Sequence, residues 1–274
     1  PFCPIKYVLS YSDNENSFSY KFDFYVSIGT IGHEVVQRWF PIANPNLMFG
    51  NWYCRRCRRT ITMTTGPVEC PGCHERMEYK ELSLHIPDAP ATGHCDGIIF
   101  EKEVEPFSEI KKVDAWVLEL KTTSRWGCMN LTAPYLGADL QATMYVSTLR
   151  KIFKKIDYGI DINFKGYIIK YFARDNPDIS SKAFMKEIEG DFLYDKTVKL
   201  ISKLYKGIRE DKPNIVFKTK PCQSGKKSGK IYAECPYADF CNLELNKKEF
   251  KEIWNDHYKT IRKDLLIKDT KLFI

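Results

Sequence analysis

The sequence predicts an α/β fold with short strands and longer helices around one hydrophobic core. Two short β-type runs, 93–100 and 113–121, are joined by a turn-rich linker, which is typical of neighbouring strands. Apolar residues recur at helical spacing in 27–40, and 191–209 has the pattern of an amphipathic helix. Because 43% of the 274 residues are hydrophobic, we expect a single domain over residues 1–274 with one inserted unit.

The first predicted element is the helix over residues 27–40. Apolar residues from Ile28 to Trp39 follow a helical period, with Ser27 as N-cap and Pro41 as stop. His33 lies beside this apolar stripe. A lone histidine at a helix edge is usually structural, so its role depends on what it meets in the fold.

Residues 52–79 are predicted to form an inserted zinc ribbon. Two Cys-x-x-Cys pairs stand twelve residues apart, and their four thiolates suit a closed, tetrahedral Zn²⁺ site: Cys54, Cys57, Cys70 and Cys73. The ribbon has little core of its own, so zinc would supply on the order of 10 kcal/mol of its folding free energy. Two roles remain open. The zinc is either a structural staple alone, or part of a nucleic-acid contact made by the neighbouring arginines Arg55, Arg56, Arg58 and Arg59.

Asp96, Glu119 and Lys121 are candidates for a second metal site. If 93–100 and 113–121 are adjacent strands, Asp96 and Glu119 meet although 23 positions separate them. Oxygen ligands favour Mg²⁺ or Mn²⁺. Strand alternation points Glu119 and Lys121 to the same face. The same triplet also fits an exposed strand surface, so other segments must decide between the two interpretations.

The rest of the chain contributes further elements. The predicted elements are strands at 81–86 and 164–172, a loop at 122–135, helices at 136–155 and 246–268, and a basic loop at 218–230. In helix 136–155, Gln141 and Tyr145 lie one turn apart on one face.

Charge and cysteine content limit the class of protein. A net charge of +7, from 42 basic and 35 acidic residues, favours polyanionic partners. No apolar run approaches the length of a membrane span and no signal-peptide pattern is present, so we expect a cytoplasmic protein with no membrane contact. The ten cysteines could form disulfides, but their spacings are those of metal ligands.

In order along the chain, four motifs resemble those of the PD-(D/E)XK nucleases: Gly29-x-x-x-His33, Gly93-x-x-Asp96, Glu119-Leu120-Lys121 and Gln141-x-x-x-Tyr145. More narrowly they resemble the RecB-like branch, which includes the CRISPR-adaptation exonucleases and many phage nucleases. The resemblance implies a restriction-endonuclease-like core, a mixed central sheet flanked by helices. The zinc ribbon is not part of that common core.

The resemblance also implies roles for these residues. A Mg²⁺ or Mn²⁺ ion would be held by Asp96, Glu119 and the carbonyl of Leu120, with His33 completing that site or a second one. Lys121 would orient or deprotonate the attacking water. Gln141 and Tyr145 would brace Lys121 and the phosphate backbone.

A second cysteine set follows from the same resemblance. It would bind a 4Fe-4S cluster through Cys3, Cys222, Cys235 and Cys241, so that segment 218–245 closes the domain as a clasp. The gap between Cys222 and Cys235 is twelve residues, longer than the usual short pair. Cys95 and Cys128 belong to neither set; we expect Cys95 to be a small buried strand residue.

The resulting functional prediction is a metal-dependent DNA nuclease, an exonuclease acting on single strands or free ends, in recombination, repair, replication or CRISPR-type processing. It would work alone or beside a helicase, replication or recombination protein, in the host cytoplasm if viral. Two alternatives are an inactive zinc/iron-sulfur nucleic-acid-binding module and a redox iron-sulfur protein. The joint presence of all the motif residues argues against an inactive site.

Overall fold

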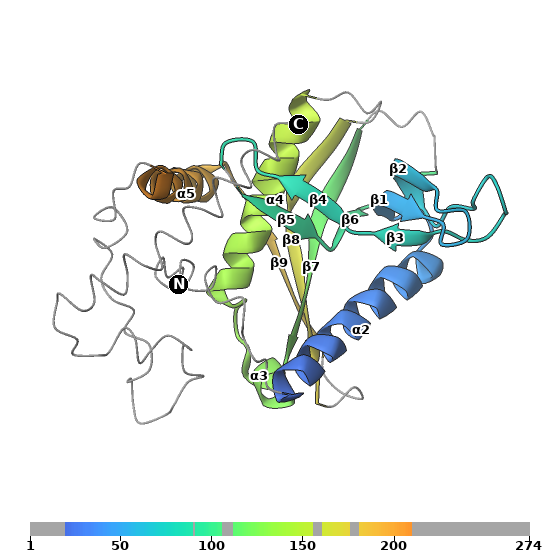
Figure 1. Cartoon of the computed structure of the whole chain (residues 1–274), viewed down its shortest axis with the longest axis horizontal. Helices are drawn as coiled ribbons and strands as arrows, with labels where there is room; N and C mark the ends of the chain where they lie inside the picture. Colours follow the sequence, from blue (N-terminus) through green and yellow to red (C-terminus); the bar gives the residue numbers. More distant parts are fainter. Residues whose placement is uncertain (1–19, 90, 106–111, 156–160, 176–180, 210–274) are drawn as a thin grey trace. The chain divides into compact units, whose positions relative to one another are not determined.

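The computed structural model describes residues 20–89, 91–105, 112–155, 161–175 and 181–209 (Figure 1). The chain divides into two compact units, Phe18–Val198 and a second formed by Pro1–Ser17 with Lys199–Ile274. In the second unit only the last turns of one helix are described, so the fold below is that of Phe18–Val198. None of the helices described is both long and apolar enough to cross a membrane.

A mixed seven-stranded sheet forms the centre of this unit. Its strands are β1 (Met48–Tyr53), β2 (Thr60–Gly66), β3 (Glu78–Lys80), β6 (Gly97–Phe100), β7 (Lys112–Thr123), β8 (Asp161–Ala173) and β9 (Ser181–Glu187). The order is β2-β1-β6-β7-β8-β9, and β3 pairs with β1 beside the β6 contact. Only the β7–β8 pair among these is parallel. The predicted α/β fold with a mixed central sheet is therefore confirmed.

The predicted strand 93–100 is split into two strands at Asp96. Residues Thr92–Cys95 form β5, which pairs with β4 (Leu82–His85) in a separate two-stranded sheet. Residues Gly97–Phe100 form β6 of the central sheet. Asp96 is therefore the residue at which the chain passes from one sheet to the other.

Four helices accompany the sheets among the residues described: α2 (Tyr20–Ala43), α3 (Arg125–Asn130), α4 (Leu136–Lys155) and α5 (Phe192–Arg209). Helix α4 has the predicted bounds, and α5 starts one residue later than predicted. The predicted loop 122–135 contains α3, whose N-cap Ser124 accepts a hydrogen bond from the Gly127 backbone N–H.

The predicted bounds of the first helix were wrong at both ends. Helix α2 passes through Ser27 and through Pro41 to end at Ala43. Proline lacks one backbone donor but fixes a φ angle that a helix accepts, so it need not stop the last turn. The Asn44 N–H donates to the Phe40 carbonyl at 2.9 Å, which closes that turn after the proline.

Helices α2 and α4 contact opposite faces of strand β7. A Cβ added at Gly29 in α2 would lie 3.5 Å from Thr122 Oγ1. The neighbouring Lys121 instead bonds Gln141 of α4, at 3.1 Å. Because successive strand residues point to opposite faces, the end of β7 lies between the two helices (Figure 1).

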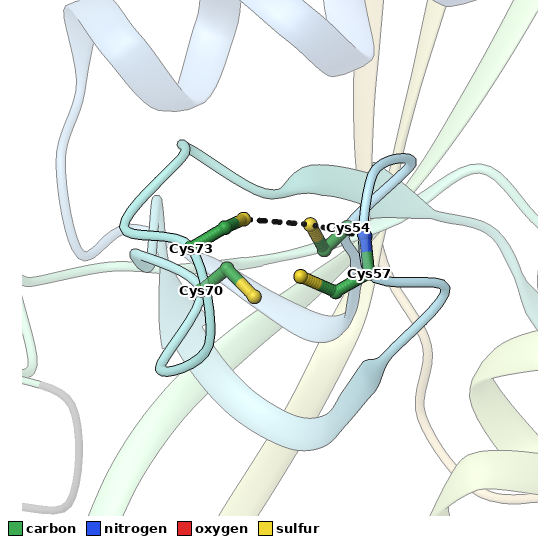
Figure 2. A group of neighbouring side chains, drawn as sticks. All are labelled: Cys54, Cys57, Cys70 and Cys73. Carbon is green, nitrogen blue, oxygen red and sulfur yellow. Dashed lines mark hydrogen bonds between the residues drawn. The ribbon is translucent and has the colours of Figure 1, made fainter.

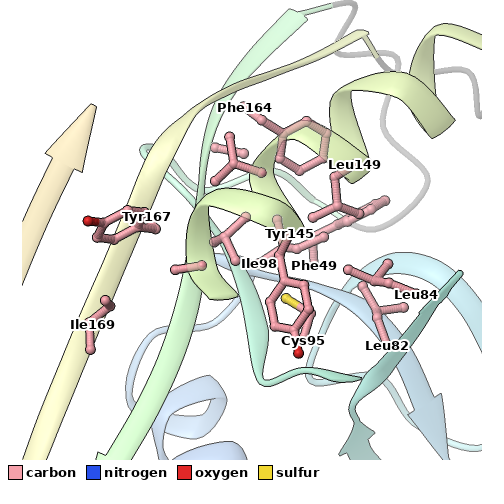
Figure 3. Packing of buried hydrophobic residues seen from close by; sticks show 14 of the residues in the cluster. Phe49, Leu82, Leu84, Cys95, Ile98, Tyr145, Leu149, Phe164, Tyr167 and Ile169 are labelled. Atoms are coloured by element: carbon pink, nitrogen blue, oxygen red, sulfur yellow. The ribbon is translucent and has the colours of Figure 1, made fainter. Parts of the chain in front are cut away.

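The main hydrophobic core lies between α4, the central sheet and the β4–β5 pair (Figure 3). Phe49 of β1 and Ile98 of β6 pack in it beside Leu149 of α4. Cys95 is fully buried in the same cluster, as expected, and burial raises the pKa of its thiol well above the usual range. Cys128 is also buried there, on α3.

The cysteine ribbon is built onto the edge of the central sheet. Strand β1 pairs with β2 and β3 of the ribbon and also with β6, through Met48 and Phe49. A second core cluster is centred on Trp52, whose indole N–H donates to the Thr64 carbonyl at 3.0 Å. Met77 completes this cluster beside Cys54 and Cys70.

Several predicted features lie outside the described residues. They are the four cysteines proposed for an iron-sulfur cluster (Cys3, Cys222, Cys235 and Cys241), the segment 218–245 with its basic loop, and the helix 246–268.

Candidate metal and catalytic site

The site forms where strand β7 runs on past its neighbour β6. The pairing of these strands reaches Gly97 opposite Leu118, but β7 continues to Thr123. The backbone of Leu120 is bonded on this side by side chains instead of by a strand. Asp96 Oδ2 accepts from the Leu120 N–H at 2.6 Å, and His33 Nε2 lies 3.1 Å from the Leu120 carbonyl oxygen.

His33, Asp96 and Glu81 form one hydrogen-bonded cluster. His33 Nδ1 lies 3.2 Å from Asp96 Oδ1 and 3.6 Å from Glu81 Oε1. Gln37, one turn after His33, donates to Glu81 Oε1 at 3.0 Å and to the Asp96 carbonyl at 3.1 Å. Potential ligand atoms of His33, Glu81 and Asp96 all lie within 4.8 Å of one another, as in a metal site.

The surroundings of His33 favour the protonated form of its ring. Hydrogen bonds to Asp96 and Glu81 raise its pKa from 6.5 to about 10, against the opposing effect of partial burial. Both ring nitrogens face oxygen acceptors, which also favours the doubly protonated ring. The cluster of oxygens therefore stabilises a cation, here a proton, at this position.

Glu119 is the most deeply buried acid of the site, with 1% of its surface exposed. Its Oε1 accepts a short hydrogen bond from Lys121 Nζ, while its Oε2 is buried and has no hydrogen-bond partner among the residues described. Burial first, and then the nearby Asp96 charge, raise the Glu119 pKa from 4.5 to about 7. A buried carboxylate oxygen that accepts no hydrogen bond needs another partner, and a bound cation would supply one.

Lys121 is held between strand β7 and helix α4. Its ammonium donates to Glu119 and, at 3.1 Å, to Gln141 Oε1. Gln141 in turn donates from Nε2 to the Tyr145 hydroxyl at 2.8 Å. Tyr145 thus contacts Lys121 only through Gln141.

Gly93 explains how Tyr145 reaches this position. A Cβ at residue 93 would lie 2.5 Å from the Tyr145 ring, so only glycine lets the β4–β5 pair pack against α4 here. The glycine of the Gly93-x-x-Asp96 motif is therefore a packing residue, and Asp96 is the one that enters the site.

Hydrogen bonds link the residues predicted for the Mg²⁺ or Mn²⁺ site in two groups that meet at β7: His33, Asp96 and Leu120 in one, and Glu119, Lys121, Gln141 and Tyr145 in the other. The group whose potential ligand atoms lie within 4.8 Å of one another contains His33, Glu81 and Asp96 but not Glu119. Sequence reasoning missed Glu81 and Gln37. Gln37 follows His33 by four residues on the same helix face, a signal that could have been used. Glu81 stands alone between β3 and β4, and no local pattern marks it as a site residue.

The four ribbon cysteines form a second candidate metal centre (Figure 2). Their sulfur atoms all lie within 4.8 Å of one another, and Cys54 Sγ is 3.5 Å from Cys73 Sγ. Sulfur atoms bound at about 2.3 Å around one tetrahedral Zn²⁺ lie about 3.8 Å apart. The cluster could therefore hold a metal such as zinc. Backbone donation, chiefly from Gly72, lowers the pKa of the Cys70 thiol to about 6, which favours a thiolate there, whereas burial and the neighbouring thiols raise the pKa values of Cys54, Cys57 and Cys73.

The two cysteine pairs share one backbone conformation. Cys54 N–H donates to the Arg59 carbonyl and Cys70 N–H to the Glu75 carbonyl, each at 2.8 Å and each five residues on. The residue after the second cysteine of each pair is left-handed, Arg58 with φ 55° and His74 with φ 60°. Both pairs therefore present two sulfur atoms to a common centre in the same way.

Comparisons of the chain with protein-family models, curated proteins and solved structures gave no match. What the two centres do must accordingly be inferred from their own chemistry.

Proposed function

We propose that the chain is a metal-dependent DNA nuclease with a PD-(D/E)XK-type core. The observation that carries this proposal is the convergence on the end of β7 of side chains from α2, from the bend between β5 and β6, from β7 itself and from α4. These residues are His33, Asp96, Glu119, Lys121 and Gln141. They are the residues that the resemblance assigns to one site, and the sequence order alone does not require them to meet.

A divalent ion fits the donor set. Potential ligand atoms of His33, Glu81 and Asp96 lie within 4.8 Å of one another, and Glu119, outside that group, has an oxygen without a hydrogen-bond partner among the described residues. Asp96, Glu119 and the Leu120 carbonyl would hold Mg²⁺ or Mn²⁺, with His33 as a further ligand after losing its proton. All of these except the imidazole are oxygen donors, the type these ions prefer. Such an ion, when bound, polarises the scissile phosphate and makes a bound water more acidic.

Lys121 supplies the positive charge of the site from the protein itself. Its ammonium is oriented by Glu119 and Gln141, and Tyr145 fixes the amide of Gln141 in turn. Since the side chain is about one-third exposed, at 32%, it remains accessible to a substrate. We assign to it the orientation of the attacking water and the stabilisation of negative charge that develops on the phosphate.

Three further assignments belong to the same proposal. The ribbon binds one Zn²⁺ through Cys54, Cys57, Cys70 and Cys73. The cysteines Cys3, Cys222, Cys235 and Cys241 bind a 4Fe-4S cluster, an assignment that rests on the resemblance alone. The substrate is DNA with single-stranded regions or free ends, handled in the cytoplasm alone or with a helicase, replication or recombination protein; the net charge of +7 is compatible with such a polyanion.

The test is a cleavage assay on end-labelled DNA, single- and double-stranded, linear and circular, with Mg²⁺, Mn²⁺ or Ca²⁺. We expect cleavage with Mg²⁺ or Mn²⁺, abolished by chelator and restored by adding the ion back. Binding without cleavage of any substrate, in anaerobically purified protein that contains both metal centres, would instead identify an inactive nucleic-acid-binding module.

A further inference from the structure

Two hollows lie between helix α2 and the cysteine ribbon, outside the residues assigned above to catalysis. The first, of about 390 Å³, is bounded by α2, β3 and the β4–β5 pair, with Arg38, Arg55, Lys80 and His94 in its wall. The second, of about 320 Å³, continues toward the end of α2 and is lined by Trp39 and Arg76. Both are lined by Gln37, Arg38, Glu78 and Tyr79, so the two hollows are neighbours, and together they are called the trough below.

The trough begins at the hydrogen-bonded cluster of His33, Asp96 and Glu81. Gln37 and Glu81 line the first hollow, and these two side chains bond each other and the Asp96 backbone. A chain molecule whose reacting phosphate lies at Asp96 and Glu119 can therefore extend directly into the trough. The ribbon, which is not needed for the catalytic arrangement, forms the opposite wall through Arg55 and Lys80.

The trough is lined by more cations than acids, which favours an anionic chain: Arg38, Arg55, Arg76 and Lys80 against Glu34, Glu78 and Glu81. Glu78 is bonded by Arg55 at 2.5 Å, and Glu81 is bonded by Gln37 and faces His33, whereas Glu34 is exposed. The Arg55–Glu78 bond uses only Nε, and within the described chain no bond is made by the two terminal nitrogens of Arg55. Arg38, Lys80 and Arg76 add three exposed cations along the same path.

An exposed aromatic side chain stands at the outer end of the trough. Trp39 is 58% exposed, although tryptophan is ordinarily among the more buried residues. The Arg38 guanidinium lies 5.8 Å from its ring centroid. A positively charged groove combined with an aromatic face is the arrangement that binds single-stranded nucleic acid, since each unpaired base can stack and each phosphate can meet a cation.

We propose that this trough binds a single nucleic-acid strand that leads away from the cleaved phosphate, with one base stacked on Trp39 and phosphates at Arg38, Lys80 and Arg55. The inference rests on the proposed nuclease function and extends it: the zinc ribbon is a wall of the substrate path, not only a staple. Inside a duplex each base is already stacked on both faces and cannot stack on Trp39, so the trough favours single strands.

The first experiment varies strand length. Binding in Ca²⁺, by fluorescence anisotropy, and cleavage in Mg²⁺ are measured on single strands of about 4 and about 16 nucleotides. Trp39→Ala should raise Kd and KM for the long strand by about tenfold, the loss expected for one base–aromatic stack, with a much smaller change for the short strand. Trp39→Phe should recover most of the loss. Far-ultraviolet circular dichroism and zinc content check that each variant is folded.

The second experiment compares two matched arginines. Arg55 and Arg56 are both exposed and each bonds one ribbon glutamate, Glu78 or Glu75, but only Arg55 lines the trough. For the long strand, Arg55→Ala should reduce the slope of log Kd against log salt by about 0.7, the value for one phosphate contact on a single strand. Arg56→Ala should leave that slope at the unmodified value.

The outcomes separate this inference from the proposed function. If the unmodified protein cleaves DNA but Trp39→Ala and Arg55→Ala bind and cleave the long strand as it does, the trough is not the strand path and the nuclease assignment stands. Equal losses for Arg55→Ala and Arg56→Ala would likewise overturn the trough, because they would indicate a diffuse charge effect. Absence of cleavage by the unmodified protein would contradict the function instead.

Discussion

Replacing Glu119 by glutamine should make the metal-free protein more stable while removing its activity. Glutamine keeps the size of the side chain and an acceptor for Lys121, but it cannot be ionised. In the unmodified protein Glu119 is almost fully buried, and one of its oxygens has no hydrogen-bond partner among the described residues. Ionising this group is therefore unfavourable unless a cation is bound.

The magnitude follows from the pKa. The Glu119 pKa rises from 4.5 to about 7 in the folded chain, and each pKa unit corresponds to about 1.4 kcal/mol, so the ionised group costs the fold about 3 kcal/mol. Since the folded pKa is raised, the acid's stabilising contribution is fully present below pH 4.5 and is lost as the pH rises through about 7. Between about pH 5 and about pH 9 we expect the free energy of unfolding to change by roughly 2–3 kcal/mol.

The assay is urea unfolding in chelator at these two pH values, for the unmodified protein, Glu119→Gln and the exposed-site control Glu103→Gln. The free energy of unfolding of Glu119→Gln, measured relative to the unmodified protein, should be greater at the higher pH than at the lower by roughly 2–3 kcal/mol. Glu103→Gln should match the unmodified protein at both. The raised pKa of His33 also makes stability depend on pH: its contribution is present below pH 6.5 and is lost toward pH 10. Because His33 is present in all three proteins, this contribution cancels when they are compared. If Glu119→Gln and the unmodified protein differ in free energy of unfolding by the same amount at both pH values, the reasoning is refuted.

Three further predictions follow from the other features. Protein purified without chelators should contain one zinc per ribbon. The double variant Cys54→Ser with Cys57→Ser should release the zinc and disorder the ribbon, because metal-binding free energy on the order of 10 kcal/mol is lost. Absence of zinc by elemental analysis would contradict this. Gly93→Ala should destabilise the fold by about 1–3 kcal/mol and slow cleavage, because the added Cβ would lie 2.5 Å from the Tyr145 ring. The control Gly137→Ala should cost no stability, because no atom lies within 4 Å of its added Cβ. Equal thermal midpoints for the two variants would contradict this prediction. Anaerobic preparations should be brown and contain iron and sulfide, lost on changing Cys235 and Cys241 to Ser; colourless protein without iron would leave these thiols free or bound to zinc.

The parts of the fold that could be predicted from the sequence are those set by local rules. Helix α4 and strand β7 were both predicted from their own stretches of sequence, and the alternation of a strand is enough to place Glu119 and Lys121 on one face. The ends of α2 could not be predicted from the residues around them. Helix packing carries the chain through Pro41, a residue that local rules assign to a stop.

The parts of the site that escaped prediction depend on contacts between distant segments. Glu81 becomes a site residue only because α2 brings His33 and Gln37 against the start of β4. The split of the predicted strand at Asp96 likewise depends on two partners, β4 for one half and β7 for the other. Strand β9 was missed because its residues are mostly exposed or half-buried and carry little hydrophobic pattern.

The most direct test of the central claim is the cleavage rate of Asp96→Asn, Glu119→Gln and Lys121→Met in Mg²⁺ or Mn²⁺, measured beside their DNA affinity in Ca²⁺. Residues that act as one catalytic unit are not additive. Each single variant should therefore lose cleavage about as completely as the double variant Glu119→Gln with Lys121→Met, while DNA binding is retained. Cleavage at the unmodified rate by both Glu119→Gln and Lys121→Met would contradict the account, and the cluster at the end of β7 would then not be a nuclease site.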